Sequence, residues 1–243
     1  MSDVRTDELM AVLCARQIHD WERLAAGANS PIPAAGVRLA QELWAPNARE
    51  AGSGDVAPFI GAKEFTQLIQ RGKVDLFFFS AVQLDRHGNM NLQYVDLPDG
   101  RRRRFQGAFA APIYYYSAKR IVMFRTEHTP RFFVDQVDYV TASAASHPRL
   151  RRHGTLTDII TPLAVLRYNP EAAGIELASV HEGHTVAEVQ AATGFSLPLA
   201  DGFGTTVPPS EQELEALHGP VYDSMAGLYP QFVARMRSEE KVG

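Results

Sequence analysis

The sequence places a carboxylate and an imidazole next to each other shortly after an apolar run. Residues 121 to 124 are expected to form a buried strand, and Glu127 and His128 follow it. In α/β sheets, ligands gather beyond the carboxyl ends of the strands. Glu127 and His128 are therefore candidates for the lining of a substrate pocket, in which they would act as an acid/base pair. The alternative is an exposed, solvated pair.

The densest charge in the chain is the run of four arginines from Arg101 to Arg104. The guanidinium fork binds phosphate oxygens in a bidentate manner, which makes Arg103 and Arg104 candidates for binding a phosphorylated ligand. As strand residues, the four would alternate between two faces, so only two of them can meet one ligand. The alternatives are a solvated hairpin arm and a contact between subunits.

Other chemistries find little support in the residue pattern. His181 and His184 lie three apart, but no cysteine or paired carboxylate completes a zinc-like set, and no metal site is expected. The sequence has no Walker-type phosphate loop and no serine nucleophile elbow. The single cysteine, Cys14, rules out an internal disulfide, fits a reducing compartment, and is expected to be a small buried side chain.

Length and composition bound the fold and the partners. The chain has 243 residues, of which 45% are hydrophobic and 21% charged, with a formal net charge of −4. We interpret residues 1–243 as a single domain with a helical segment over about 208–243. Neither the charge nor the aromatic spacing favours nucleic acid. The sequence has no membrane-spanning run and no visible secretory signal, so a cytoplasmic protein is expected.

Apolar patterns predict the elements that must position these residues. We expect helices over 7–21, 34–43, 62–70 and 185–192, and strands over 74–82, 120–125, 137–141, 163–168 and 175–180. The last two strands flank turn residues and are expected to form a hairpin. Ser210 and Glu213 fit a capping box at the start of the C-terminal helical segment. Strands that alternate with helices predict an α/β fold, with an open, mostly parallel sheet and flanking helices.

Four segments, in order along residues 7 to 200, resemble the β-type half of glutaconate CoA-transferases, in the class I CoA-transferase family. The most specific segment is 83–91, which matches the family's Q-x-D-x-x-G-N-x-N element after an apolar strand. The other segments are 30–46, 119–141 and 159–195. The Ser30-Pro31 step also resembles the small subunit of steroid-ring-opening CoA hydrolases.

The resemblance implies a class I CoA-transferase-like fold and a two-subunit enzyme whose α-type partner shares that fold. Coenzyme A would be a cosubstrate rather than a permanently bound cofactor, and an acyl-CoA would bind between the subunits. In the transferases, a glutamate of the β-type chain attacks the acyl-CoA, which gives an acyl anhydride and then an enzyme–CoA thioester. Position makes Glu50 the candidate nucleophile and Asn89 a further catalytic candidate. Ser30, Arg103 and Arg104 are candidates for binding CoA.

The chain departs from the family pattern at two places. Glu50 lies only four residues beyond Pro46, too few for the expected strand, so a solvated loop carboxylate is the alternative; Glu64 is a weaker candidate nucleophile. The loop after Arg104 keeps a single glycine where the family has several.

The residues of that loop are candidates nevertheless. Gly107 and Ala108 would bind the CoA thioester through backbone amides. Phe109, Tyr114 and Tyr115 would line a pocket for a bulky ring, or the tyrosines would simply pack on the sheet.

These features lead to one function and two alternatives. We expect a β-type subunit of a CoA-transferase-like heteromer that acts on an acyl-CoA thioester by CoA transfer, or by hydrolysis with a base from the partner subunit. The first alternative is a catalytically silent scaffold subunit that completes the partner's active site. The second is a small-molecule-binding protein that has lost CoA chemistry.

Overall fold

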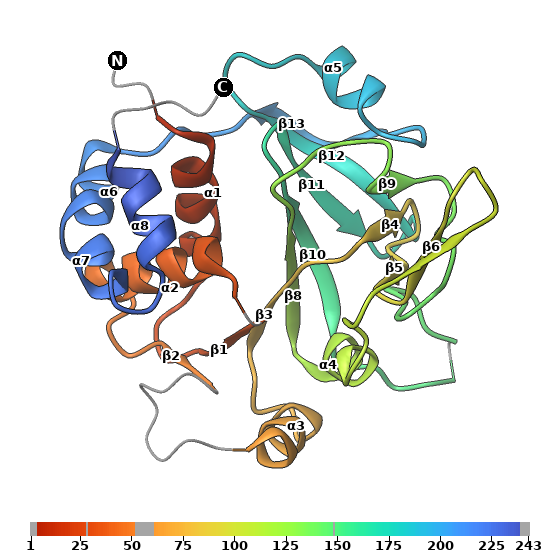
Figure 1. Cartoon of the computed structure of the whole chain (residues 1–243), viewed down its shortest axis with the longest axis horizontal. Helices are drawn as coiled ribbons and strands as arrows, with labels where there is room; N and C mark the ends of the chain where they lie inside the picture. Colours follow the sequence, from red (N-terminus) through yellow and green to blue (C-terminus); the bar gives the residue numbers. More distant parts are fainter. Residues whose placement is uncertain (1–3, 28, 52–60, 148, 239–243) are drawn as a thin grey trace.

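A computed structural model of the chain describes residues 4–27, 29–51, 61–147 and 149–238. Within these residues, the central sheet has the strand order β13-β12-β11-β10-β8-β3-β1-β2 (Figure 1). The strands are β1 (Arg23–Ala26), β2 (Arg49–Glu50), β3 (Leu76–Phe79), β8 (Arg120–Phe124), β10 (Thr155–Ile160), β11 (Ala164–Asn169), β12 (Gly174–Val180) and β13 (Leu199–Thr205). All neighbours pair in parallel except β11, which is antiparallel to β10 and β12. The predicted mostly parallel α/β sheet is confirmed.

Alternate side chains of the central strands lie in separate cores on the two faces of the sheet. In β3, Leu76 and Phe78 belong to one buried cluster, and Phe77 and Phe79 belong to the other. The strands β8 and β10 divide their side chains in the same way. A strand that is covered on both faces needs apolar side chains at every position, which explains the continuous apolar run of β3.

Helices from both ends of the chain cover the first face of the sheet. They are α1 (Thr6–Ala15), α2 (Pro31–Leu43), α6 (Glu211–Ala216), the π-helical η1 (Leu217–Val221), α7 (Tyr222–Met225) and α8 (Pro230–Arg237) (Figure 1). The helices α1 and α2 approach closely at Gly36, where a Cβ atom would lie 2.8 Å from Cβ of Cys14. Arg16 donates two hydrogen bonds to the carboxylate of Glu213, at 2.9 and 2.7 Å, and so ties α1 to the C-terminal segment. The predicted capping box of Ser210 and Glu213 is confirmed.

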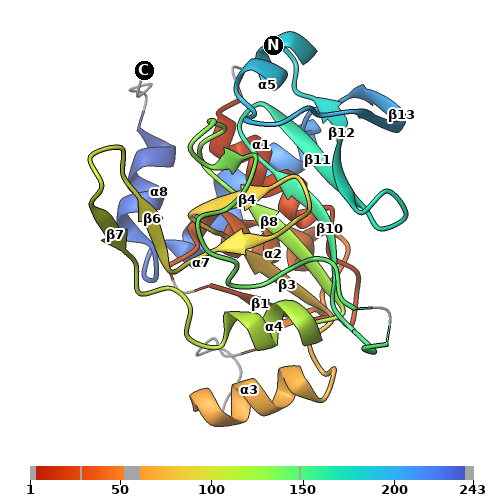
Figure 2. The ribbon, with the colours of Figure 1, turned by 90° about the vertical axis from the view of Figure 1, so that its right-hand side faces the viewer.

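Shorter elements cover the second face (Figure 2). They are α4 (Ala111–Ser117) and a small sheet of β5 (Met90–Asn91), β4 (Gln83–Asp85) and β9 (Phe133–Val134). The hairpin of β6 (Tyr94–Asp96) with β7 (Arg102–Arg104) projects beside them and joins neither core. The helix α3 (Ala62–Gln70) packs beside α4, and α5 (Val186–Ala191) lies beyond the hairpin of β11 and β12. Phe65, Phe77 and Tyr114 form a contiguous aromatic group between α3, the sheet and α4.

The element predictions succeed best where the apolar pattern is long. Helix 62–70 and the hairpin of β11 and β12 are confirmed. The first helix ends at Ala15 rather than at residue 21, because Trp21 has a positive φ and residues 23–26 form β1. The expected strand over 137–141 is wrong, and β9 lies just before it. Residues 239–243 of the expected C-terminal segment lie outside the described residues, and the single-domain interpretation stays a prediction.

Candidate active site

The carboxyl ends of the parallel strands bring together residues that are far apart in the sequence. Ser30 follows β1, and Glu50 is the last residue of β2. In the parallel register, Leu24 of β1 lies opposite Glu50. Arg125 comes directly after β8, which is connected to β1 through β3. Because parallel strands end at one edge of the sheet, these three residues lie along the same edge, where α/β sheets bind their ligands.

Glu50 lies in a strand rather than in a loop, and its side chain is half-buried. The strand β2 is short, as the spacing from Pro46 predicts, and Ala51 N–H donates to the carbonyl of Leu24 at 2.7 Å. The phenol of Tyr229 lies within the electrostatic reach of Glu50: burial raises the pKa of Tyr229, and the negative charge of Glu50 raises it further. The segment 52–60, which contains the glycine expected after Glu50, lies outside the described residues.

Ser30 and Tyr229 each precede a helix that begins with proline. Ser30 is the N-cap of α2, and its carbonyl accepts a hydrogen bond from Ala34 N–H at 3.1 Å. Tyr229 is the N-cap of α8, and its carbonyl accepts from Val233 N–H at 3.0 Å. Proline is favoured at the first helical position because its missing N–H would have no partner there. The backbone of Ser30 lies near enough to the Tyr229 phenol to lower its pKa, so the two helix starts are neighbours.

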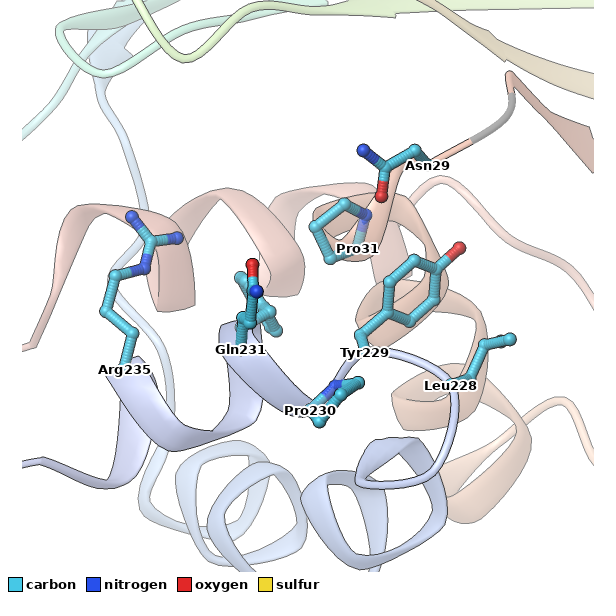
Figure 3. A pocket seen from close by; sticks show the side chains of 8 residues that line it. Asn29, Pro31, Leu228, Tyr229, Pro230, Gln231 and Arg235 are labelled. Atoms are coloured by element: carbon cyan, nitrogen blue, oxygen red, sulfur yellow. The ribbon is translucent and has the colours of Figure 1, made fainter.

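A surface pocket of about 480 Å³ opens between these two helix starts (Figure 3). Its lining residues are Asn29, Pro31, Leu228, Tyr229, Pro230, Gln231, Phe232 and Arg235. Figure 3 shows Asn29 and Pro31 on the side of α2, with Gln231 and Arg235 projecting from α8. Arg235 is hydrogen-bonded to the carboxylate of Asp7. Sequence patterns did not identify this pocket, and the local signals that could have pointed to it are the prolines at the two helix starts.

The element over 83–91 forms a hydrogen-bonded loop between β4 and β5. The buried carboxylate of Asp85 accepts hydrogen bonds from His87 N–H and Asn89 N–H, both at 3.0 Å, and from the Asn89 side-chain amide at 2.9 Å. Gly88 has a φ of +71°, and a Cβ atom there would lie 2.6 Å from Cβ of Ala144. The loop geometry therefore accounts for Asp85, Gly88 and Asn89, and the catalytic role of Asn89 stays a prediction.

The remaining polar residues of this element bond to the neighbouring loop. Asn91 is fully buried, and its amide donates to the side-chain oxygen of Gln83 and to the carbonyl of Tyr94, both at 2.7 Å. Gln83 donates to the carboxylate of Asp138 at 3.0 Å and accepts from Asp138 N–H at 3.1 Å. These bonds hold residue 138 without a strand, which is the physical reason that the predicted strand over 137–141 does not form.

Glu127 and His128 do not lie together as an acid/base pair. The Glu127 carboxylate is half-exposed and lies 3.7 Å from the guanidinium of Arg125. The His128 ring is buried, with Nδ1 2.8 Å from the hydroxyl of Thr161 and Nε2 3.0 Å from that of Thr193. Burial lowers the pKa of His128 to about 4, and the nearby His181 also acts to lower it. His128 therefore joins β10 to the end of α5 as a neutral side chain.

The tyrosines of α4 pack inside this chain. Tyr115 is fully buried, and its hydroxyl donates to the carbonyl of Gly88 at 3.1 Å. The hydroxyl of Tyr114 lies 3.0 Å from that of Thr66 on α3. The sequence left two alternatives for these tyrosines, lining a pocket for a bulky ring or packing on the sheet, and their contacts within this chain are those of packing. Their role in a ring-binding pocket stays a prediction, which the buried hydroxyl of Tyr115 does not favour.

The loop before α4 is exposed. A Cβ atom on Gly107 would lie 3.2 Å from the Leu92 side chain, and the Ala108 carbonyl accepts from Ala111 N–H at 2.7 Å. Phe109 is 80% exposed and has a positive φ. The ring of Phe109 thus projects from the surface of this chain, where a partner chain or a ligand can reach it.

The arginine run lies on the exposed hairpin of β6 and β7. Arg102 donates to the Asp96 carboxylate at 2.6 and 3.0 Å, and its guanidinium lies 3.7 Å from the ring centre of Tyr94. Arg103 lies over the Phe105 ring at 5.2 Å, and Arg104 is exposed. The structure places Arg103 and Arg104 on a surface arm, and their contact with coenzyme A stays a prediction.

Two further polar residues near the carboxyl edge escaped the sequence reasoning. In the part of the chain that the structure describes, the buried side-chain polar atoms without a hydrogen-bond partner are Nε of Arg125 and the hydroxyl of Thr129. Both residues belong to the loop directly after β8. The signal that could have found Arg125 is its position next to the strand, ahead of the Glu127-His128 pair.

The described ranges hold neither a metal-binding cluster nor a membrane span. There, histidine, cysteine and acidic side chains form no group of three or more that could hold a metal ion. The described helices are all too short or too polar to cross a membrane.

Comparison with known proteins identifies the family. The family model described as coenzyme A transferase matches residues 52–192, which is more than half of the chain. The chain belongs to the coenzyme A transferase family. Members of this family use coenzyme A as a cosubstrate. The resemblance to the β-type chains of class I CoA-transferases is confirmed.

Similar members of the family catalyse more than one reaction. The chain is 29% identical to the B subunit of 3-oxoadipate CoA-transferase from Pseudomonas knackmussii, over 89% of this chain and 93% of that protein. It is 26% identical to the IpdB subunit of the cholesterol ring-cleaving hydrolase from Rhodococcus jostii, over 89% and 92%. The solved glutaconate coenzyme A-transferase from Acidaminococcus fermentans superposes with a TM-score of 0.78 at 18% identity, over 93% and 97%. This likeness shows the shared fold.

Proposed function

We propose that this CoA-transferase-family chain is the β-type subunit of a heteromer that acts on an acyl-CoA thioester. The observation that carries the proposal is the position of Glu50, at the carboxyl end of β2 and across the strand register from β1. Ser30 follows β1 at the same edge, and Tyr229 connects this edge to a pocket. A carboxylate in this position can reach a thioester that is bound along the edge.

The Glu50 carboxylate would act as a nucleophile. Its oxygen bonds to the thioester carbonyl carbon, and the carbon–sulfur bond breaks, so that CoA thiolate leaves and a mixed anhydride forms. The thiolate then attacks the Glu50 carbonyl, which gives an enzyme–CoA thioester and releases the substrate acyl group as a carboxylate. A second carboxylate accepts CoA through the reverse steps. If water attacks instead, the same edge supports hydrolysis with a base from the partner.

The partner would be an α-type chain, since two of the similar proteins are themselves named as subunits. Gly107 and the exposed Phe109 lie on the surface that such a partner can reach. Arg103 and Arg104 would contact the phosphates of CoA. A cytoplasmic location, in keeping with the buried Cys14, is part of this proposal.

The decisive experiment uses the heteromer that co-purifies with an α-type chain. Glu50→Gln is expected to lower acyl-CoA turnover at least about 1,000-fold, because a covalent catalyst cannot be replaced by a neutral amide. Glu171→Gln, in the exposed turn between β11 and β12, is the matched control and should retain activity. Borohydride or hydroxylamine should inactivate the wild-type heteromer in the presence of acyl-CoA, but not the Glu50→Gln heteromer. Full turnover by Glu50→Gln would eliminate the covalent role and leave the silent scaffold as the better interpretation.

A further inference from the structure

We propose that the pocket between the starts of α2 and α8 receives the acyl group of the thioester, and that Tyr229 positions this group against Glu50. This inference rests on the proposed function and deepens it, because it assigns a substrate class to the same edge. The favoured substrates are acyl groups with an apolar, ring-containing body that carries a hydroxyl or keto oxygen.

The pocket has the size and place that this role requires. Its volume of about 480 Å³ lies within the range of small-molecule sites, roughly 300 to 1,000 Å³. Asn29 and Pro31, on either side of Ser30, line the pocket together with residues 228–232 and Arg235. Figure 3 shows Pro31 and Tyr229 as neighbours in this lining. Tyr229 belongs to this lining, and the pKa of its phenol responds to the backbone of Ser30 and to the charges of Glu50 and Arg38. It is therefore the side chain that the pocket shares with the proposed reaction centre.

The phenol of Tyr229 has the protonation state that a positioning residue needs. Burial is the largest cause that raises the pKa of Tyr229, so its hydroxyl keeps its proton at neutral pH. The protonated hydroxyl can donate one hydrogen bond to an oxygen nearby. The carbonyl oxygen of the bound acyl group and the carboxylate of Glu50 are the acceptors at this edge.

The apolar and hydrogen-bonding side chains that line the pocket determine which acyl groups fit it. Pro31, Leu228, Pro230 and Phe232 offer apolar surface that suits the faces of a ring. The polar groups are the amides of Asn29 and Gln231 and the guanidinium of Arg235. Since Arg235 is already paired with Asp7, the pocket offers hydrogen bonds rather than an unmatched positive charge. A neutral hydroxyl or keto oxygen fits this lining better than a second carboxylate.

The test measures binding by calorimetry to the co-purified heteromer that carries Glu50→Gln, so that turnover does not consume the ligand. The probes are cyclohexanecarbonyl-CoA and its 3-hydroxy and 3-carboxy derivatives. The hydroxylated ligand is expected to bind about 10-fold more tightly than the other two, as a hydrogen bond in a partly apolar pocket contributes. Adding Gln231→Leu should remove most of this preference. Arg237→Gln, on the same helix but paired with Asp223 outside the lining, is the matched control and should keep it.

The positioning role of Tyr229 needs a second readout, in the heteromer with native Glu50. Tyr229→Phe is expected to lower kcat about 10- to 100-fold with little change in KM, because the phenol orients the reacting group rather than supplying affinity. A urea midpoint of Tyr229→Phe equal to that of the wild-type heteromer would confirm that the fold is intact. Equal affinity for the three ligands, or a preference that survives Gln231→Leu, overturns the pocket assignment. An unchanged kcat in Tyr229→Phe overturns the positioning role. Full activity of Glu50→Gln defeats only the proposed covalent function, so the two failures are distinguishable.

Discussion

The carboxylate of Asp85 accepts hydrogen bonds from both the backbone N–H and the side-chain amide of Asn89, at 3.0 and 2.9 Å. Because Asp85 is buried and also accepts from His87 N–H, we expect Asp85→Ala to leave three donors without their partner. The expected loss is about 2–4 kcal/mol of unfolding free energy, measured by urea denaturation. Asn89→Ala should cost about 1 kcal/mol, since it removes a single side-chain bond. Two variants with wild-type midpoints would show that this carboxylate does not hold the loop.

Gly88 and Gly100 offer a matched pair for separating backbone strain from crowding. Both have positive φ, but a Cβ atom would meet Ala144 at Gly88 and nothing within 4 Å at Gly100. Gly100→Ala is expected to cost about 1 kcal/mol for the left-handed backbone alone. Gly88→Ala should cost a further 1–3 kcal/mol, roughly, for overpacking. The comparison of the two urea midpoints checks this, and equal midpoints would contradict the crowding.

Because His128 is buried, we expect the free energy of unfolding to decrease in mild acid. Burial lowers its pKa to about 4 in the folded chain, whereas an exposed histidine titrates near 6.5. Between these values the unfolded state binds the extra proton, so the contribution of His128 is complete above about pH 6.5 and decreases as the pH falls toward 4. The contribution is at most about 3 kcal/mol. Urea midpoints measured across this range should decrease in the wild type and decrease less in His128→Gln. An identical slope in the two proteins would mean that His128 is not the group responsible.

If the exposed arginines of the β6–β7 hairpin bind CoA, we expect their removal to weaken CoA affinity in a salt-dependent manner. Replacing both Arg103 and Arg104 with glutamine is expected to raise the KM for acyl-CoA about 5- to 10-fold at low salt, as lost charge-assisted phosphate contacts would. The difference should shrink as the ionic strength increases. Arg101→Gln is the control, because Arg101 is paired with Asp99 in the turn of the same arm. A KM that is the same in all three proteins would assign the arm to solvent or to the partner chain.

The parts of the fold that could be predicted are those in which consecutive residues are all apolar and all buried. Leu76 to Phe79 of β3 are apolar on both faces, so their run is recognisable without any partner. The strand β1 has only four residues, Arg23–Ala26, and its pairing with β3 and β2 supplies the stability that its own pattern lacks. Residues 137–141 have a strand-like pattern, but Asp138 and Thr141 bond to β4 and to Leu92, and no ladder forms.

The candidate site likewise contains residues that the sequence could indicate and residues that it could not. Glu50 and Ser30 could be proposed because they stand next to recognisable elements of the sequence. Tyr229 could not, because its approach to Ser30 depends on the packing of the C-terminal segment against α1 and α2, about 200 residues away along the chain. The separation of Glu127 from His128 was also beyond the sequence, since it is set by the hydroxyls of Thr161 and Thr193.

The shared core of the first and last helices has a consequence for synthesis of the protein. Apolar side chains of α1 and α2 pack against Leu217, Tyr222 and Phe232, so the nascent chain emerges from the ribosome long before the residues that cover its first helices are translated. During that interval the early helices expose apolar surface to solvent. Chains with exposed apolar surface bind chaperones and tend to aggregate. Slow translation of residues 211–237 would prolong this exposure.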